Sequence, residues 1–319
     1  MSDEEENAAS SGTEYSPNFL FIQYSELFER SFSAETADEC ISAAVRCLTL
    51  AKISYSHSNV ILRAQWHCML ARAYWLLKGL GPQTYDHAKS ALQVLTEPAP
   101  TKSKQTDDIA SQDWKLHLQT TLESLMLAAK ALRSMGKSCE AKQYIKKALH
   151  IFKQNKSRMN DDEQTQWTLQ LYDELSYNEY DLERINDACV HLEVVIQVVE
   201  NTGESESSIL IPLYLRMARL LEKMSQKQKA IEYYKRAHNA AFSKPIVDIT
   251  TADASIVVIK QLIHRAEGLI DDKKLKEYLE SAAAVYARDL GENDPKTIEV
   301  QCILNGLKCE HSDQSDSDR

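Results

Sequence analysis

The chain has 319 residues, and its 47 Asp and Glu against 37 Lys and Arg give a formal net charge of −10. This acidic balance disfavours generic binding to nucleic acid or to anionic membranes. No window approaches the roughly 20 apolar residues of a membrane-spanning helix, and the acidic start, Met-Ser-Asp-Glu-Glu-Glu, is unlike a signal peptide. Only 8 Gly and 7 Pro interrupt long stretches of good helix formers. We therefore expect an all-α, soluble, cytoplasmic protein.

A recurring order of large and small side chains predicts helix hairpins. The clearest instance has Leu125, Ala128 and Leu132 on a first helix, Gly136 at a turn and Ala141 on a second helix. Small residues let two helices approach closely, and large residues fill the space that remains. This order resembles the tetratricopeptide template, in which a pair of helices repeats along the chain.

Six hairpins of this type follow one another. The intervals between them exceed the usual repeat of about 34 residues, so we place the surplus in longer second helices and in polar loops. After the sixth hairpin, an amphipathic helix at 294–308 suits a terminal cap. The residue that anchors the second helix of each hairpin is, in order, Cys40, Ala88, Ala141, Ala188, Ala230 and Leu275.

The predicted fold is a tetratricopeptide-repeat-like superhelical solenoid of about six helix hairpins plus a C-terminal capping helix, thirteen helices in all. We expect its superhelix to be right-handed. The repeat domain is predicted to span residues 17–309, between a disordered acidic N-terminus at 1–16 and a disordered acidic tail at 310–319.

The glycines of the second hairpin allow two interpretations. Lys78-Gly79-Leu80-Gly81 could belong to a phosphate-binding loop, which needs a strand before the glycines and backbone amides at the start of the next helix. Here a helical pattern precedes the glycines, and Pro82 removes one amide. We predict instead that Gly79 ends the first helix and that Pro82 lies in the first turn of the second.

Two stretches carry a closer resemblance. Residues 46–59, RCLTLAKISYSHSN, and 70–95, LARAYWLLKGLGPQTYDHAKSALQVL, resemble the tetratricopeptide repeat protein 23 and 23-like family. The resemblance implies a non-enzymatic protein of the cilium, centrosome or microtubule cytoskeleton, with links to ciliary Hedgehog signalling. It does not extend to the further C-terminal repeats of the longer family member. Residues 284–297, AVYARDLGENDPKT, resemble the long repeats of kinesin light chains, which implies a cargo or motor adaptor as the alternative.

No catalytic or metal-binding constellation stands out. The nine histidines form no H-x-x-x-H or H-x-x-H pair, and the seven cysteines form no C-x-x-C pair. The carboxylates Asp161, Asp162 and Glu163 fall at a predicted helix start, where negative charge is favourable. The sequence predicts no enzyme activity, no cofactor and no metal.

The first helix of each hairpin should line a concave groove through positions 2, 5, 9 and 12 of the repeat. The residues at these positions are basic and aromatic, the types that dominate interface energetics. They predict a groove for an acidic amphipathic helix or peptide of a partner protein. An alternative is that the tyrosines and the tryptophan only fill the inner wall. The predicted groove residues are Arg72, Trp75, Met126, Lys130, Arg133, Tyr177, Tyr180 and Arg219.

A second basic feature lies on the helix predicted around 141–158. Lys142, Lys146, His150 and Lys153 follow one face of this helix. Such a stripe is usually a solvated surface, and the alternative is an electrostatic dock for acidic partners. A further hypothesis is that the acidic ends of the chain occupy the basic groove.

Overall fold

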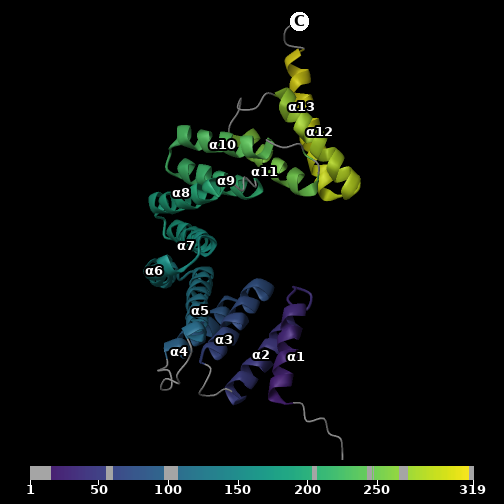
Figure 1. Ribbon diagram of the computed structural model, residues 1–319. Coiled ribbons are helices and arrows are strands. Elements are labelled where there is room, and N and C mark those ends of the chain that lie inside the picture. Colours follow the sequence, from purple (N-terminus) through teal and green to yellow (C-terminus); the bar gives the residue numbers. More distant parts are fainter. Residues whose placement is uncertain are drawn as a thin grey trace, which may run out of the picture. The chain divides into compact units, whose positions relative to one another are not determined.

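The computed structural model describes residues 16–54, 60–96, 107–202, 207–242, 246, 248–265 and 272–315 (Figure 1). Within these ranges the regular structure is helical, with thirteen α-helices and no strand, which confirms the predicted fold class. A π-helical turn, η1 (Tyr74–Lys78), and a 3-10 turn, η2 (Lys156–Arg158), add to them. The α-helices are α1 (Pro17–Arg30), α2 (Ala37–Ser54), α3 (Val60–Ala73), α4 (Gly81–Thr96), α5 (Asp107–Ser134), α6 (Ser138–Asn155), α7 (Asp161–Asp181), α8 (Ile185–Asn201), α9 (Ser207–Lys223), α10 (Lys227–Phe242), α11 (Ile249–Arg265), α12 (Asp272–Asp289) and α13 (Pro295–Ser315).

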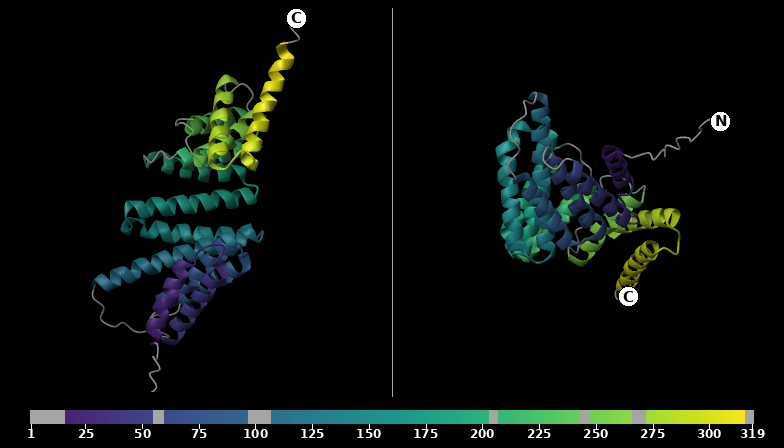
Figure 2. Two further views of the ribbon diagram at one scale, coloured as in Figure 1. Left: turned by 90° about the vertical axis from the view of Figure 1, so that its right-hand side faces the viewer. Right: turned by 90° about the horizontal axis from the view of Figure 1, so that it is seen from below.

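Consecutive helices pack as hairpins. The pairs are α1 with α2, α3 with α4, α5 with α6, α7 with α8, α9 with α10 and α11 with α12. The last helix, α13, lies beside α12 (Figure 2). The six pairs correspond to the six predicted hairpins, and α13 corresponds to the predicted terminal helix. Short connections make neighbouring helices antiparallel, and each hairpin then buries its apolar faces against the next.

The chain divides into two compact units, residues 1–159 with α1 to α6 and residues 160–319 with α7 to α13. The helix α13 extends to Ser315, beyond the predicted domain end at 309. Residues 1–15 and 316–319 lie outside the described residues. The predicted domain boundaries, the disordered ends and the handedness of the superhelix therefore stay predictions.

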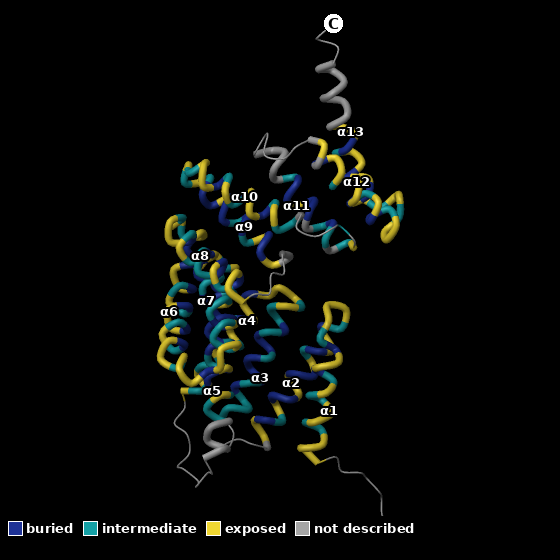
Figure 3. Tube along the Cα trace, turned by 45° about the horizontal axis from the view of Figure 1, so that its top comes forward, coloured by how far each residue is buried: buried dark blue, intermediate teal, exposed yellow. Residues whose placement is uncertain are grey.

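The cores are built from the residues that the repeat pattern singles out. The anchor residues of the second helices are all buried, and four of them, Cys40, Ala88, Ala141 and Ala188, have no exposed surface. Figure 3 shows buried positions of the core as dark blue segments, for example along α2 and α3. Because a larger side chain at these close contacts would overpack the core, the small residues of the pattern define how closely the helices approach.

Three hairpins share one turn geometry. Gly136 has a φ of 75°, and the equivalent residues Glu183 and Ser225 both have a φ of 60°. In each of these turns, the amides of the left-handed residue and of the residue after it donate to carbonyls in the last turn of the preceding helix. For example, the amide of Lys137 donates to the carbonyl of Leu132 at 2.9 Å. A left-handed residue after a helix is usually glycine because other residues pay a steric cost there. Glu183 and Ser225 adopt this conformation without being glycine.

The second hairpin confirms the predicted turn. Gly79 follows η1 with a φ of 63° and ends the first helix, and α4 begins at Gly81 with Pro82 in its first turn. Gly81 is buried against α5, where an added Cβ would lie 2.7 Å from Ser134 Oγ. A helix precedes these glycines, so the strand that a phosphate-binding loop requires is not present at this point.

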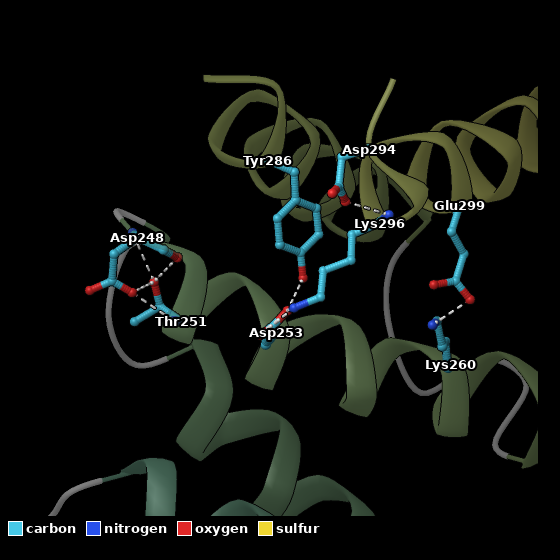
Figure 4. Close-up of polar contacts among 8 residues, drawn as sticks. All are labelled: Asp248, Thr251, Asp253, Lys260, Tyr286, Asp294, Lys296 and Glu299. Carbon is cyan, nitrogen blue, oxygen red and sulfur yellow. Dashed lines mark hydrogen bonds and ion pairs between the residues drawn. The ribbon is translucent and has the colours of Figure 1, made fainter. Parts of the chain in front are cut away.

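Polar contacts join the last three helices (Figure 4). The Asp253 carboxylate of α11 accepts hydrogen bonds from the Tyr286 hydroxyl of α12 at 2.7 Å and from Lys296 Nζ of α13 at 2.8 Å. Lys260 Nζ of α11 forms an ion pair with Glu299 of α13 at 2.6 Å. Burial opposes ionisation of Asp253, but the bonds from Lys296 and Tyr286 prevail and hold its pKa below the ordinary value. These contacts fix α13 as the cap of the second unit.

Candidate functional site

The second unit has a groove between α7 and α9. Its volume is about 510 Å³, within the range of ligand-binding clefts. Three of the predicted groove residues, Tyr177, Tyr180 and Arg219, line it together. The other lining residues include Arg216 and Lys223, which the sequence analysis did not select. We call this feature the α7–α9 groove.

The α7 side of the groove presents two exposed aromatic rings. Tyr177 and Tyr180 are 39% and 38% exposed and lie three residues apart, which puts both on one face of the helix. The adjacent Ser176 is buried and donates to the carbonyl of Ala188 on α8 at 2.9 Å, which fixes the other face of α7 against its hairpin partner. The two tyrosines are therefore partly exposed on the face of α7 that lines the groove, and a binding role for them stays a prediction.

The α9 side places a cation over each ring. The Arg216 guanidinium carbon lies 4.0 Å from the centre of the Tyr177 ring, and Lys223 Nζ lies 4.2 Å from the centre of the Tyr180 ring. Arg216 also forms an ion pair with Asp173 of α7 at 2.6 Å, and Lys223 donates to the Tyr180 hydroxyl. Cation–π contacts of this kind contribute about 0.5–1 kcal/mol each at exposed sites. They hold the two rings in fixed orientations.

Arg219 lies between these two cations on the same face of α9. Its Nε donates to the carbonyl of Leu215 at 3.2 Å, and the described part of the chain supplies no carboxylate partner. Its terminal nitrogens therefore keep the planar fork of donors that binds a carboxylate in bidentate geometry. Asp181 of α7 and Glu222 of α9 also line the groove, so the cleft carries both signs of charge, with its three cationic side chains on α9.

The five predicted groove residues of the first unit have different surroundings. Arg72 Nε donates to Glu123 Oε1 at 2.5 Å, so its charge is compensated by α5. Trp75 packs against the alanine-rich core between α3, α4 and α5. Met126 was expected on the exposed inner face but is only 4% exposed, because α5 turns this position into the core. Lys130 and Arg133 are half-buried on α5. A binding role for these five residues stays a prediction.

The sequence pattern did not predict Arg216 and Lys223 as groove residues, because the repeat template selects positions within one hairpin. They precede and follow Arg219 by three and four residues, a spacing that puts all three on one helical stripe. That stripe was visible in the sequence. Its alignment with Tyr177 and Tyr180 depends on how two successive hairpins pack, which the template does not give.

The described residues contain no group of three or more His, Cys, Asp or Glu side chains that could hold a metal ion. The predicted capping role of the acidic run at 161–163 is confirmed. Asn160 caps α7 by accepting from the amide of Glu163 at 2.7 Å, and the Glu163 carboxylate accepts from the amide of Asn160 at 3.2 Å. Among the described helices, none is long and apolar enough to cross a membrane.

The fold defines the class of protein, a tetratricopeptide-like helical solenoid. Among solved structures, the apo form of RapI matches with a TM-score of 0.55 and 13% identity, over 93% of this chain and 76% of that one. A Podosopora anserina putative kinesin light chain with nearly identical TPR-like repeats matches with a TM-score of 0.50 and 16% identity, over 71% of this chain and 96% of that one. At these identities the likeness concerns the fold alone.

The sequence is similar to tetratricopeptide repeat protein 23 and its 23-like relative. It is 24% identical to tetratricopeptide repeat protein 23 of Rattus norvegicus over 82% of this chain and 57% of that protein. It is 26% identical to the 23-like protein of Bos taurus over 68% of this chain and 67% of that protein. The chain thus spans little more than half the length of the first of these relatives. No protein-family model matches the sequence. The resemblance seen in the sequence motifs is confirmed.

Proposed function

We propose that this protein is a non-enzymatic scaffold or adaptor that binds an acidic segment of a partner protein in the α7–α9 groove. The observation that carries the proposal is the position of Arg219. Its terminal nitrogens have no carboxylate partner among the described residues. Arg219 lines the groove together with two exposed tyrosines, each of which contacts a cation. A carboxylate of the partner would pair with Arg219, and apolar side chains beside it would cover the tyrosine rings. Arginine and tyrosine at the centre of a cleft are typical interface anchors.

We propose further that the complex belongs to a cilium, a centrosome or the cytoskeleton. The support is the similarity to tetratricopeptide repeat protein 23 and 23-like proteins over most of this chain. A link to ciliary Hedgehog signalling is part of the same proposal. Proximity labelling with the full chain in ciliated cells tests both points, because it reports the location and the neighbours together. Labelling that is confined to unrelated cytosolic proteins would refute the ciliary assignment.

The groove itself is tested with a matched pair of variants. Arg219→Glu reverses the charge in the groove, and Lys229→Glu makes the same charge change on the exposed surface of α10. We expect Arg219→Glu to remove the neighbours that proximity labelling finds with the wild type, while Lys229→Glu keeps them. Circular dichroism should give equal helix content for all three proteins. If the neighbours survive Arg219→Glu and also Tyr177→Ala, the groove assignment is wrong.

The second candidate is an adaptor between a motor and its cargo. It is favoured by the resemblance of residues 284–297 to kinesin light chain repeats, and the putative kinesin light chain shares the fold. Affinity purification of the full chain distinguishes the two candidates. Recovery of motor subunits would support the motor adaptor. Recovery of ciliary partners without motor subunits would support the first proposal.

A further inference from the structure

A second groove lies on the first unit, between the second helices of two successive hairpins, α4 and α6. Its volume is about 410 Å³. Lys89, Leu92 and Gln93 of α4 line one side, and Gln143, Tyr144 and Lys147 of α6 line the other. None of the described residues that line it is acidic. The α4–α6 groove is therefore a positively charged cleft on a chain whose net charge is −10.

The two ammonium groups of this groove are not engaged in ion pairs within the described part of the chain. Lys89 and Lys147 are exposed, and the described residues form no ion pair with either ammonium group. Other lysines of the described chain, such as Lys260 and Lys296, are paired with carboxylates of neighbouring helices. The helix α6 carries four lysines and a single acidic residue, Glu140. An anionic ligand would meet two ammonium groups that no described carboxylate pairs with.

The remaining polar groups of the groove are hydrogen-bonding groups. The hydroxyls of Tyr85 and Tyr144 lie 3.2 Å apart. Burial and the Tyr85 hydroxyl raise the pKa of Tyr144 to about 12, so the Tyr144 hydroxyl keeps its proton at neutral pH. One hydroxyl donates to the other, and the second proton remains available for a ligand. Gln93 and Gln143 are exposed on opposite sides and each offers an amide donor and an amide acceptor.

We propose that the α4–α6 groove is a second docking surface, which takes an acidic peptide segment of a partner protein. Lys89 and Lys147 pair with its carboxylates, Gln93 and Gln143 pair with its backbone amides, and Leu92 contacts one apolar side chain. This site is separate from the α7–α9 groove and does not depend on it. It includes Lys147 of α6 but none of the residues of the basic stripe, Lys142, Lys146, His150 and Lys153, so a role for that stripe stays a prediction.

A peptide fits this surface better than nucleic acid or a membrane. Amide side chains match a peptide backbone, which has both donors and acceptors, whereas phosphate groups only accept. A polyphosphate chain or an anionic bilayer would extend beyond the groove, over a chain whose net charge is −10. A short acidic segment of a partner protein would instead contact only the local positive charge of the groove.

The test is fluorescence anisotropy with the full chain and a fluorescein-labelled peptide of about ten glutamates with one central leucine. The variant Lys89→Glu/Lys147→Glu should weaken binding at least about tenfold, because two attractive charges become repulsive. The matched control Lys227→Glu/Lys229→Glu makes the same change in net charge on exposed residues of α10 and should leave binding within about twofold. The milder Lys89→Gln/Lys147→Gln should give an intermediate loss, which guards against misfolding of the first variant.

Four results would overturn the proposal, the fourth of which concerns Arg219. The first is an absence of peptide binding by the wild type, and the second is an equal loss in the two double glutamate variants, which would show a net-charge effect only. The third is a stronger Lys89- and Lys147-dependent binding of oligouridine or of phosphatidylserine vesicles than of the peptide. Arg219→Glu serves as an additional variant in the same assay. If Arg219→Glu alone abolishes peptide binding, the acidic segment belongs to the α7–α9 groove; unchanged binding supports an independent site.

Discussion

Two histidines in the first unit make its stability depend on pH. His67 of α3 and His87 of α4 place their Nδ1 atoms 3.3 Å apart, and His67 is only 8% exposed. Burial lowers the pKa of His67 from 6.5 to about 4, and the positive charges of Lys52 and Arg63 and the neighbouring His87 act in the same direction. Burial also lowers the pKa of His87. The native state therefore favours neutral rings, and a neutral pair can share one proton in a hydrogen bond.

The sign and the size of the effect follow from these values. Between the folded pKa of about 4 and the unfolded pKa of 6.5, the unfolded chain binds the proton of His67 more tightly. The contribution of His67 to the free energy of unfolding is thus complete above pH 6.5 and decreases as the pH drops toward 4. The interval corresponds to at most about 3 kcal/mol, of which about 2 kcal/mol is lost at pH 5. Protonation of His87 adds a loss of the same sign.

The assay compares urea unfolding of the wild type and of His67→Gln, followed by circular dichroism at pH 7.5 and pH 5. Glutamine cannot titrate in this range, so we expect the variant to lose about 2 kcal/mol less than the wild type on acidification. The control His150→Gln changes an exposed histidine of α6 and should behave as the wild type. Parallel losses in the wild type and in His67→Gln, or an NMR titration of His67 near pH 6.5, would refute the reasoning.

Two further predictions concern backbone positions. Gly81→Ala should lower the free energy of unfolding by about 1 kcal/mol, because the new Cβ displaces Ser134 Oγ from its 2.8 Å hydrogen bond to a carbonyl of α5. The loss should be smaller in a Ser134→Ala background. Equal losses in both backgrounds, measured by urea unfolding, would contradict this contact. Glu183→Gly and Ser225→Gly should each raise the free energy of unfolding by up to about 1 kcal/mol, because glycine adopts a φ of 60° without strain; thermal melts that show no gain for either variant would argue against strain at these turns.

The parts of the fold that depend on local spacing were predictable from the sequence. The hairpins follow from a pattern of small and large residues, and the buried anchors Cys40, Ala141 and Ala188 lie where that pattern put them. The turn at Gly79 and Pro82 was also predictable, because both residues have strong and opposite preferences at helix ends. Each of these inferences needs only residues that are close in sequence.

Features that depend on contacts between hairpins were not predictable. The sequence shows a glycine at position 81, but not that Ser134, more than fifty residues later, occupies the space of its missing side chain. It likewise gives no sign that Glu183 adopts a positive φ, since the residue is not of the type that favours this conformation. Met126 was assigned to the exposed face by its position in the template, and the packing of α5 buries it.

The same limit explains why the α7–α9 groove was found only in part, and it also indicates what the groove selects. Tyr177 and Tyr180 were selected by position, but their orientation comes from Arg216 and Lys223 of the next hairpin, which cover one side of each ring. With those two cations engaged, Arg219 is the remaining cationic donor on this stripe of α9. A partner therefore gains most when it presents one carboxylate to Arg219 with apolar groups about one helical turn to either side.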